Sequence, residues 1–140
     1  MKAFTVYQPY AFSIVAGLKR FETKSQRTNL RERVAVHAGA KDFDAAMKGR
    51  SQEDRDKIAA LQHTSPFIDN VLYQGAIIGT VEIAGCVPVE AIKDALTAQE
   101  LLLGDYSPGR FAWVLKNPIM FDNPISIRGQ QGWWNWNENI

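Results

Sequence analysis

The chain has 140 residues, of which 46% are hydrophobic and 22% are charged, the proportions of an ordinary soluble globular domain. Collagen-like, coiled-coil and wholly disordered proteins are therefore excluded. Sixteen basic and fifteen acidic side chains give a net charge of +1, so any binding to nucleic acid must depend on a local patch rather than on overall charge.

The cysteine count and the hydropathy pattern exclude further classes. The single Cys86 cannot form an intramolecular disulfide, and together with two histidines it cannot supply a usual structural zinc site. No segment approaches the roughly 20 apolar residues of a membrane span, and the first residues lack the apolar run of a signal peptide. We therefore expect one cytoplasmic domain over residues 1–140, with no membrane contact and no bound metal.

The first elements are a strand over residues 3–7 and a helix directly after it. Pro9 suits the first turn of a helix, and Gly17 suits its end. Between them, apolar residues recur at helical spacing: Ala11, Ile14, Val15 and Leu18. Residues 33–38 then alternate as a second strand, which places His37 on the face opposite its valines.

The middle of the chain predicts a helical insert followed by a long strand. The polar stretch at about 41–65 has no β-branched run, and Ser51 resembles a helix cap, so we expect one or two helices there that pack on the sheet. Residues 76–89 give the strongest strand signal. That strand is long enough to bend at Gly79 or Gly85, as strands do at the corners of barrels.

The last third predicts a short helix and three more strands. A capping box opens a helix that runs to residue 103, and strands follow at 111–115, 125–127 and 133–136, with Asn-Pro breaks between the first two. Short strands with a helix after the first predict an α+β domain built on a small β-barrel, with further short helices on its surface.

A run of basic side chains lies between the first helix and the second strand. Residues 19–33 hold six basic side chains and two acidic ones. The basic residues are Lys19, Arg20, Lys24, Arg27, Arg31 and Arg33. Such a run contacts phosphates whatever the base sequence, or it is simply a solvated loop.

Lys19, Glu22 and Glu82 form a second group of interest. Glu82 lies in a strand of mostly apolar or small residues, and a carboxylate there must either face solvent or find a partner. We expect a lysine, Lys19, to be that partner. The pair would hold an anionic ligand or act as nucleophile and base, or it would be a salt bridge that fastens the helix end to the sheet.

Large rings are numerous for a domain of this size. They are Tyr7, Tyr10, Trp113, Trp133, Trp134 and Trp136. Rings beside a basic patch stack on the bases of a single-stranded nucleic acid, although most of these should belong to the core. His37 has no second metal ligand nearby in its strand, so we interpret it mainly as a hydrogen-bonding residue of the fold.

Several blocks of the sequence together resemble a known family. They are residues 7–11, 16–25, 34–39, 75–82, 111–115 and 125–133. In order and spacing they resemble the ASCH domain of the PUA-like superfamily. The resemblance implies a small β-barrel with a cleft between the first helix and the sheet, in a family associated with RNA binding and, in some members, catalysis.

The resemblance also implies a set of site residues. The cleft would be lined by Gln8, Tyr10, Lys19, Glu22, Lys24, His37 and Glu82. For binding RNA, a nucleoside or a nucleotide we expect Gln8, Tyr10, Lys19, Lys24, Arg27, His37 and Arg128. Lys24 stands where many members have arginine, which keeps the charge without the bidentate guanidinium fork.

Two hydrolase activities and an adaptor role are the alternatives to a binding module. One branch of the family removes the acetyl group of N4-acetylcytidine with a Lys, a Thr and a Glu. Lys19 and Glu82 match the first and last of these, and Glu22 stands in place of the threonine. Other members are metal-dependent ribonucleases for single-stranded RNA. We expect no cofactor for a binding module, and Mn²⁺ or Mg²⁺ only for a ribonuclease.

Overall fold

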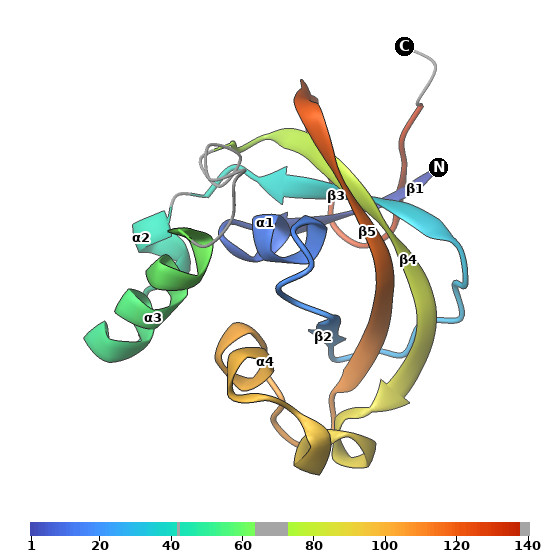
Figure 1. Ribbon diagram of the computed structural model, residues 1–140. Coiled ribbons are helices and arrows are strands. Elements are labelled where there is room, and N and C mark those ends of the chain that lie inside the picture. The colour runs from blue at the N-terminus through green and yellow to red at the C-terminus, as the bar shows by residue number, and fades with distance from the viewer. Residues whose placement is uncertain (42, 64–72, 138–140) are drawn as a thin grey trace.

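The computed structural model describes residues 1–41, 43–63 and 73–137, which form one mixed sheet with helices around it (Figure 1). The strands are β1 (Lys2–Tyr7), β2 (Phe21–Lys24), β3 (Arg33–Gly39), β4 (Ala76–Pro88), β5 (Phe111–Ser126) and β6 (Trp134–Asn135). The helices are α1 (Tyr10–Val15), α2 (Phe43–Ala46), α3 (Gln52–His63) and α4 (Ala98–Leu103), with 3₁₀ turns η2 (Val89–Ala91) and η3 (Lys93–Ala95).

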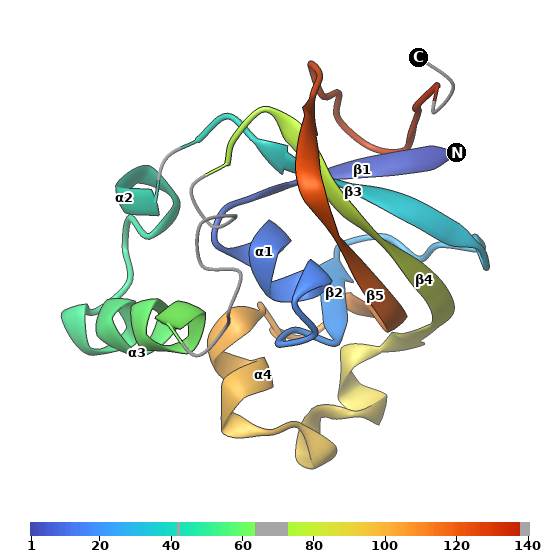
Figure 2. The ribbon, with the colours of Figure 1, turned by 45° about the horizontal axis from the view of Figure 1, so that its top comes forward.

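The sheet is curved and open rather than closed. Its strand order is β2-β5-β4-β3-β1-β6, with β1 and β3 parallel and the other neighbours antiparallel. Within the described residues no backbone pairing joins the edge strands β2 and β6, so the predicted barrel is not confirmed, whereas the predicted α+β class is. In Figure 2, β1 and β3 lie side by side, and the C-terminal segment returns along the outer edge of β1.

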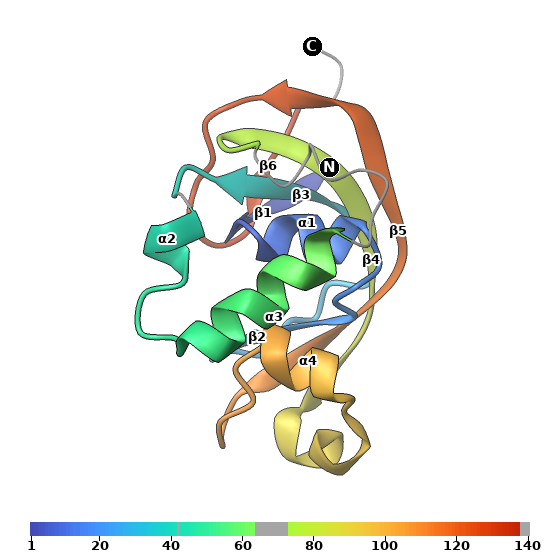
Figure 3. The ribbon, with the colours of Figure 1, turned by 60° about the vertical axis from the view of Figure 1, so that its left-hand side comes forward.

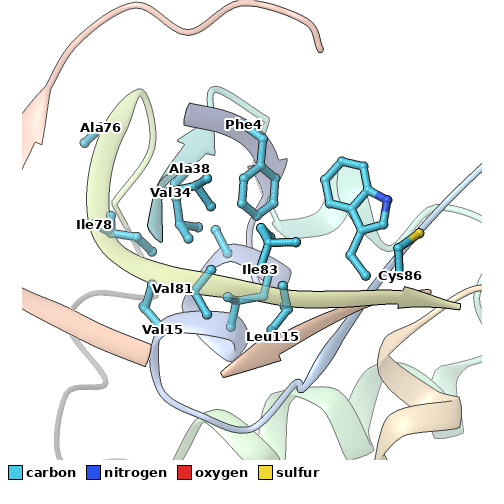
Figure 4. Packing of buried hydrophobic residues seen from close by; sticks show 14 residues of the cluster. Phe4, Val15, Val34, Ala38, Ala76, Ile78, Val81, Ile83, Cys86 and Leu115 are labelled. Carbon is cyan, nitrogen blue, oxygen red and sulfur yellow. The ribbon is translucent and has the colours of Figure 1, made fainter. Parts of the chain in front are cut away.

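The short helix α1 fills the concave side of the sheet. Its apolar residues recur at the spacing read from the sequence, and Ile14 and Val15 join the main core cluster with residues of β3, β4 and β5 (Figure 4). Gly17 follows α1 with a φ of 79°, a left-handed conformation that glycine adopts without steric cost. The helix therefore stops where the sequence predicts.

Bulges bend the two longest strands around α1. The β4–β5 register shifts between Ile77 and Gly79, between Thr80 and Glu82, and between Ile83 and Gly85, so an irregularity adjoins each of the two glycines at which a bend was predicted. The two strands predicted at 111–115 and 125–127 are one strand, β5. Its prolines, residues 118 and 124, fall in the register shifts, where the ladder requires no N–H and proline is tolerated.

The helical insert packs on other helices, not on the sheet as expected. Met47 and Ile58 are buried against Leu103 of α4, with Tyr10 and Leu18 beside them, and Figure 3 shows α3 lying across α1 and α4. The predicted cap is confirmed, since the Asp54 N–H donates to Ser51 Oγ at 3.1 Å. Residues 64–65 of the predicted insert lie outside the described residues.

A buried carboxylate ties α4 to the start of β2. Thr97 caps α4 by accepting a hydrogen bond from the Glu100 N–H at 3.1 Å, as the capping box predicts. The Glu100 side chain does not return to the cap. It accepts from the Arg20 N–H at 2.8 Å and from the Tyr106 hydroxyl at 3.4 Å. Burial raises the pKa of the Tyr106 phenol, and the neighbouring Glu100 carboxylate raises it further. The carboxylate therefore fixes α4 against the sheet edge.

In the described part of the chain, no helix has the length and apolarity needed to cross a membrane.

At Gly79, where the curved sheet is most tightly packed, we expect the addition of one methyl group to lower the stability of the fold strongly. A Cβ at Gly79 would lie 2.2 Å from the Ile119 carbonyl oxygen and 2.7 Å from Val15 Cγ1. Because backbone must move to admit it, we expect Gly79→Ala to lower the free energy of unfolding by at least about 2 kcal/mol. At Gly85 the nearest atom would be 3.4 Å away, so Gly85→Ala is the matched control. Equal urea midpoints for the two variants would contradict this account.

Candidate functional site

Two adjoining cavities form a cleft bordered by basic side chains. The first, of about 490 Å³, lies among Thr5, Tyr7, Lys24, His37, residues 39–40, Gly75 and the loop 128–132. The second, of about 290 Å³, lies among Phe4, Thr5, residues 24–27, Trp113, Gly132 and Trp133. They share Thr5, Lys24 and Gly132, and among the described residues no carboxylate lines either cavity. We call the two together the basic cleft.

Lys24 stands at the junction of the two cavities. It is the last residue of β2 and pairs with Phe111 in the β2–β5 ladder. Its ammonium lies 5.8 Å from the centre of the Trp113 ring, a cation–π contact that holds the charge without neutralising it. Lys24 forms no ion pair within the described part of the chain, so its charge is available to an anionic ligand.

The second cavity combines a cation with stacked rings. The guanidinium of the exposed Arg27 lies 5.0 Å from the centre of the Phe111 ring. Trp113 and Trp133 stack with ring centres 4.9 Å apart and planes 12° apart, and Phe4 meets both rings edge-on. Aromatic surface and positive charge therefore occur side by side, as the sequence hypothesis for nucleic-acid binding requires.

Close backbone approach shapes the floor of the first cavity. A Cβ at Gly129 would lie 2.5 Å from the His37 ring, and one at Gly39 would lie 2.7 Å from the Tyr7 ring. Only glycine permits both contacts. The Tyr7 ring remains 48% exposed, and the ammonium of Lys41 lies 4.9 Å from its centre.

His37 is buried, and its two ring nitrogens contact Thr5 of β1 and Ile127, the residue before the loop 128–132. Nε2 lies 2.7 Å from the Ile127 carbonyl and must donate to it, and Nδ1 lies 3.2 Å from Thr5 Oγ1. The Thr5 hydroxyl also lies 3.1 Å from the Gln130 carbonyl. Burial lowers the pKa of His37, and the hydrogen bond to Ile127 opposes this in part. The ring therefore serves as a neutral structural bridge, as the sequence analysis expects.

Lys19 and Glu22 form a buried ion pair away from the cleft walls. Lys19 Nζ lies 3.2 Å from Glu22 Oε1, and it also donates to the Phe21 carbonyl. The same carboxylate oxygen accepts from the Thr23 N–H at 3.1 Å, while Oε2 is buried with no hydrogen-bond partner in the structure. Lys19 is only 2% exposed, and neither residue lines the basic cleft.

Glu82 pairs with an arginine rather than with the expected Lys19. Its carboxylate lies 3.3 Å from Arg33 NH2 across the β3–β4 ladder and accepts from the Asn117 amide at 3.0 Å. Its side chain is 43% exposed. The bulges of β4 place Val81 and Ile83 in the core and turn Glu82 away from it. The structure therefore does not bring the three candidate catalytic residues together.

Gln8 and Tyr10 also lie outside the basic cleft. The buried Gln8 accepts from the Phe12 N–H at 2.9 Å and donates to the Tyr73 carbonyl at 3.0 Å, so it holds the start of α1. The Tyr10 ring packs with the insert helices, with the Arg50 guanidinium 5.6 Å from its centre. Burial raises the pKa of the Tyr10 phenol, and Arg50 opposes that shift.

The basic run of the sequence separates into different roles. Lys19 is buried, Arg20 lies 4.0 Å from Glu100, and Arg33 pairs with Glu82. The Arg31 guanidinium donates to the carbonyls of residues 28 and 30. Of the six cations, only Lys24 and Arg27 line the basic cleft, where Arg128 joins them as expected.

Sequence reasoning missed Lys41 and the role of Tyr7 in the first cavity. Tyr7 ends β1 and pairs with Gly39 at the end of β3, which brings Lys41 beside it. The signal in the sequence was a charged residue, Lys41, close after a strand that ends in glycine. Among the described residues, no three His, Cys, Asp or Glu side chains gather as metal ligands would.

The buried ion pair predicts a large and asymmetric effect on stability. Lys19→Met leaves the Glu22 carboxylate buried without its cation, and we expect this to lower the free energy of unfolding by about 3–5 kcal/mol. The double variant Lys19→Met with Glu22→Leu removes both charges and should recover most of the loss. Chemical denaturation of the two variants and the wild type measures both effects. A single variant within about 1 kcal/mol of the wild type would contradict the pairing.

His37 predicts a loss of stability on the acidic side. Its pKa in the folded protein lies below the ordinary value, about 6.5 in an unfolded chain, so the unfolded state binds more protons below that pH. The contribution of His37 to stability is complete above about pH 6.5 and declines as the pH falls. His37→Gln keeps a donor and an acceptor but does not titrate. Its free energy of unfolding should therefore fall less than that of the wild type between about pH 6.5 and 5; parallel curves would refute the prediction.

Comparisons with known proteins identify the family. The model of the ASCH domain family matches residues 4–125. A crystal structure of ASCH from Zymomonas mobilis is similar, with a TM-score of 0.57 at 15% identity over 98% of this chain and 87% of that one. A serine-to-alanine variant of ZmASCH gives 0.55 at 16% over 98% and 88%, and a tyrosine-to-phenylalanine variant 0.56 at 14% over 98% and 90%. None of the curated proteins matches. Since the family model spans most of the chain and the shared fold covers nearly all of it, the chain belongs to the ASCH domain family, which is associated with RNA binding.

Proposed function

We propose that this ASCH domain binds single-stranded RNA in the basic cleft. Lys24, Arg27 and Arg128 would contact phosphates, and the rings beside them would stack on bases. The observation that carries the proposal is the lining of the cleft: the described residues place three cations and several rings there and no carboxylate, in a chain whose net charge is only +1.

The form of the cleft favours single strands over duplexes. Its cavities are small, and two of the cations that line them, Lys24 and Arg27, lie over aromatic rings. Bases must be unstacked from their neighbours to reach such rings, which a single strand permits at little cost. A duplex would present phosphates to the cleft but would leave the rings unused.

Binding is better supported than hydrolysis. The amidohydrolase alternative requires Lys19, Glu22 and Glu82 to act together, but Glu82 pairs with Arg33 while the other two pair with each other. The ribonuclease alternative with Mn²⁺ or Mg²⁺ has no cluster of candidate ligands within the described residues. An adaptor role would not explain why the charges of Lys24 and Arg27 are left in the cleft without an acidic partner among the described residues.

The proposal predicts a salt-sensitive affinity for RNA. Three phosphate contacts at about 0.7 counterions each predict a slope near −2 in a plot of log K against log salt, or about a 15-fold weaker affinity at 200 mM than at 50 mM. Fluorescence anisotropy with a labelled ten-nucleotide RNA measures this slope. Lys24→Ala and Arg27→Ala should each make the slope shallower by about 0.7.

Lys48→Ala is the matched control, because Lys48 is an exposed lysine between α2 and α3 that lines neither cavity. It should leave the affinity and the slope unchanged. An equal loss in Lys48→Ala and Lys24→Ala would show that the RNA follows overall charge and not the basic cleft. Absence of binding at low salt would refute the proposed function altogether.

A further inference from the structure

We propose that the basic cleft is built for one dinucleotide step, with a nucleoside in each cavity and the phosphate that links them at Lys24. This inference rests on the proposed function and goes beyond it, because it assigns the length of the ligand and the place of its central phosphate. It follows from the distribution of the cations between the two cavities of the cleft.

The distribution of the three cations between the two cavities is the first argument. Arg128 lines only the first cavity, Arg27 lines only the second, and Lys24 lines both. One cation is therefore shared by the two cavities, and each cavity has one further cation of its own, a division that matches one linking phosphate and two flanking phosphates of a single strand. A basic patch that is only solvated does not require one charge at the boundary of two cavities and one further charge in each of them.

The sizes of the cavities are the second argument. Sites that enclose a small molecule have volumes of roughly 300–1,000 Å³. The second cavity, at about 290 Å³, lies at the lower end of that range, and the first, at about 490 Å³, lies in its lower half. Each is suited to one nucleoside at most, so a longer strand must occupy both cavities or leave one empty.

Each cavity also has its own aromatic surface. The first has the half-exposed Tyr7, and the second has Trp133, which is supported from behind by its stack on Trp113. Base–aromatic stacking tolerates any base, so the two cavities would select for ligand length more than for sequence. Lys24 is held between them by Trp113, which limits its reach to a phosphate at the junction.

The test compares small ligands that differ in one feature. The probes are uridine, the dinucleoside monophosphate UpU, and UpU with a neutral methylphosphonate in place of its phosphate. Intrinsic tryptophan fluorescence and calorimetry report the binding. We expect UpU to bind at least about tenfold more tightly than uridine, and the neutral analogue to lose about tenfold relative to UpU. A third uridine should add only the contact of its phosphate with Arg27 or Arg128, because both cavities are already occupied.

Lys24→Ala shows whether that phosphate lies at Lys24. In this variant UpU and its neutral analogue should bind equally, because the charge they differ in has lost its partner. Arg27→Ala removes a cation of the second cavity and not the one shared by both cavities, so it should preserve the difference between the two probes. If the neutral analogue stays weaker than UpU in Lys24→Ala, the phosphate lies elsewhere and the assignment is overturned.

Failure of this inference differs from failure of the proposed function. If the ten-nucleotide RNA binds but UpU binds no tighter than uridine, the dinucleotide assignment is wrong and the binding function stands. If neither the ten-nucleotide RNA nor UpU binds, the dinucleotide assignment and the proposed binding function are both wrong. If affinity keeps rising steeply from two to six nucleotides, the ligand extends beyond the cleft and the two-cavity assignment is again overturned.

Discussion

The bend of the β4–β5 ladder around α1 is the constraint on which the rest of this structure depends. Three register shifts let two long strands curve, and the concave side they create is filled by a helix of only six residues. At Gly79 the sheet approaches both β5 and Val15 so closely that no side chain fits. A flat sheet would leave α1 exposed, and the loops that border the basic cleft would not meet.

The polar groups inside this fold mostly serve the framework. Gln8 holds the start of α1, Glu100 fixes α4, and Lys19 with Glu22 joins the end of α1 to β2. Each of these side chains gives a hydrogen bond or an ion pair to a backbone group or a charge that would otherwise be buried without a partner. The function therefore depends on side chains that the fold leaves unneutralised, and these lie together at the open side of the sheet, between the end of β2 and the loop 128–132.

Much of the fold was predictable because its signals are local. Gly17, Thr97 and the glycines of β4 acted as their conformational preferences indicate. The two prolines of β5 led to a wrong prediction of two separate strands, because proline is tolerated at a bulge inside a continuous strand. For the candidate site, the structure places Lys24, Arg27, His37 and Arg128 around one cleft. Gln8 and Tyr10 lie outside that cleft, and Glu82 pairs with Arg33 and not with Lys19. These misplaced residues are polar or charged, and their partners lie on other elements whose positions the sequence does not indicate.

The sequence by itself determined the α+β class and the points where most elements begin and end, since backbone preferences and the spacing of apolar residues act over a few neighbouring positions. The order of its motifs carried the family resemblance. The sequence did not indicate strand β2, and it divided β5 into two strands. Only the tertiary structure decided which cations remain available. Arg33 is neutralised by a residue 49 positions away, and the Arg20 backbone is held by one 80 positions away. The charge that a residue presents to a ligand depends on such distant partners, and these are chosen by packing rather than by the local sequence.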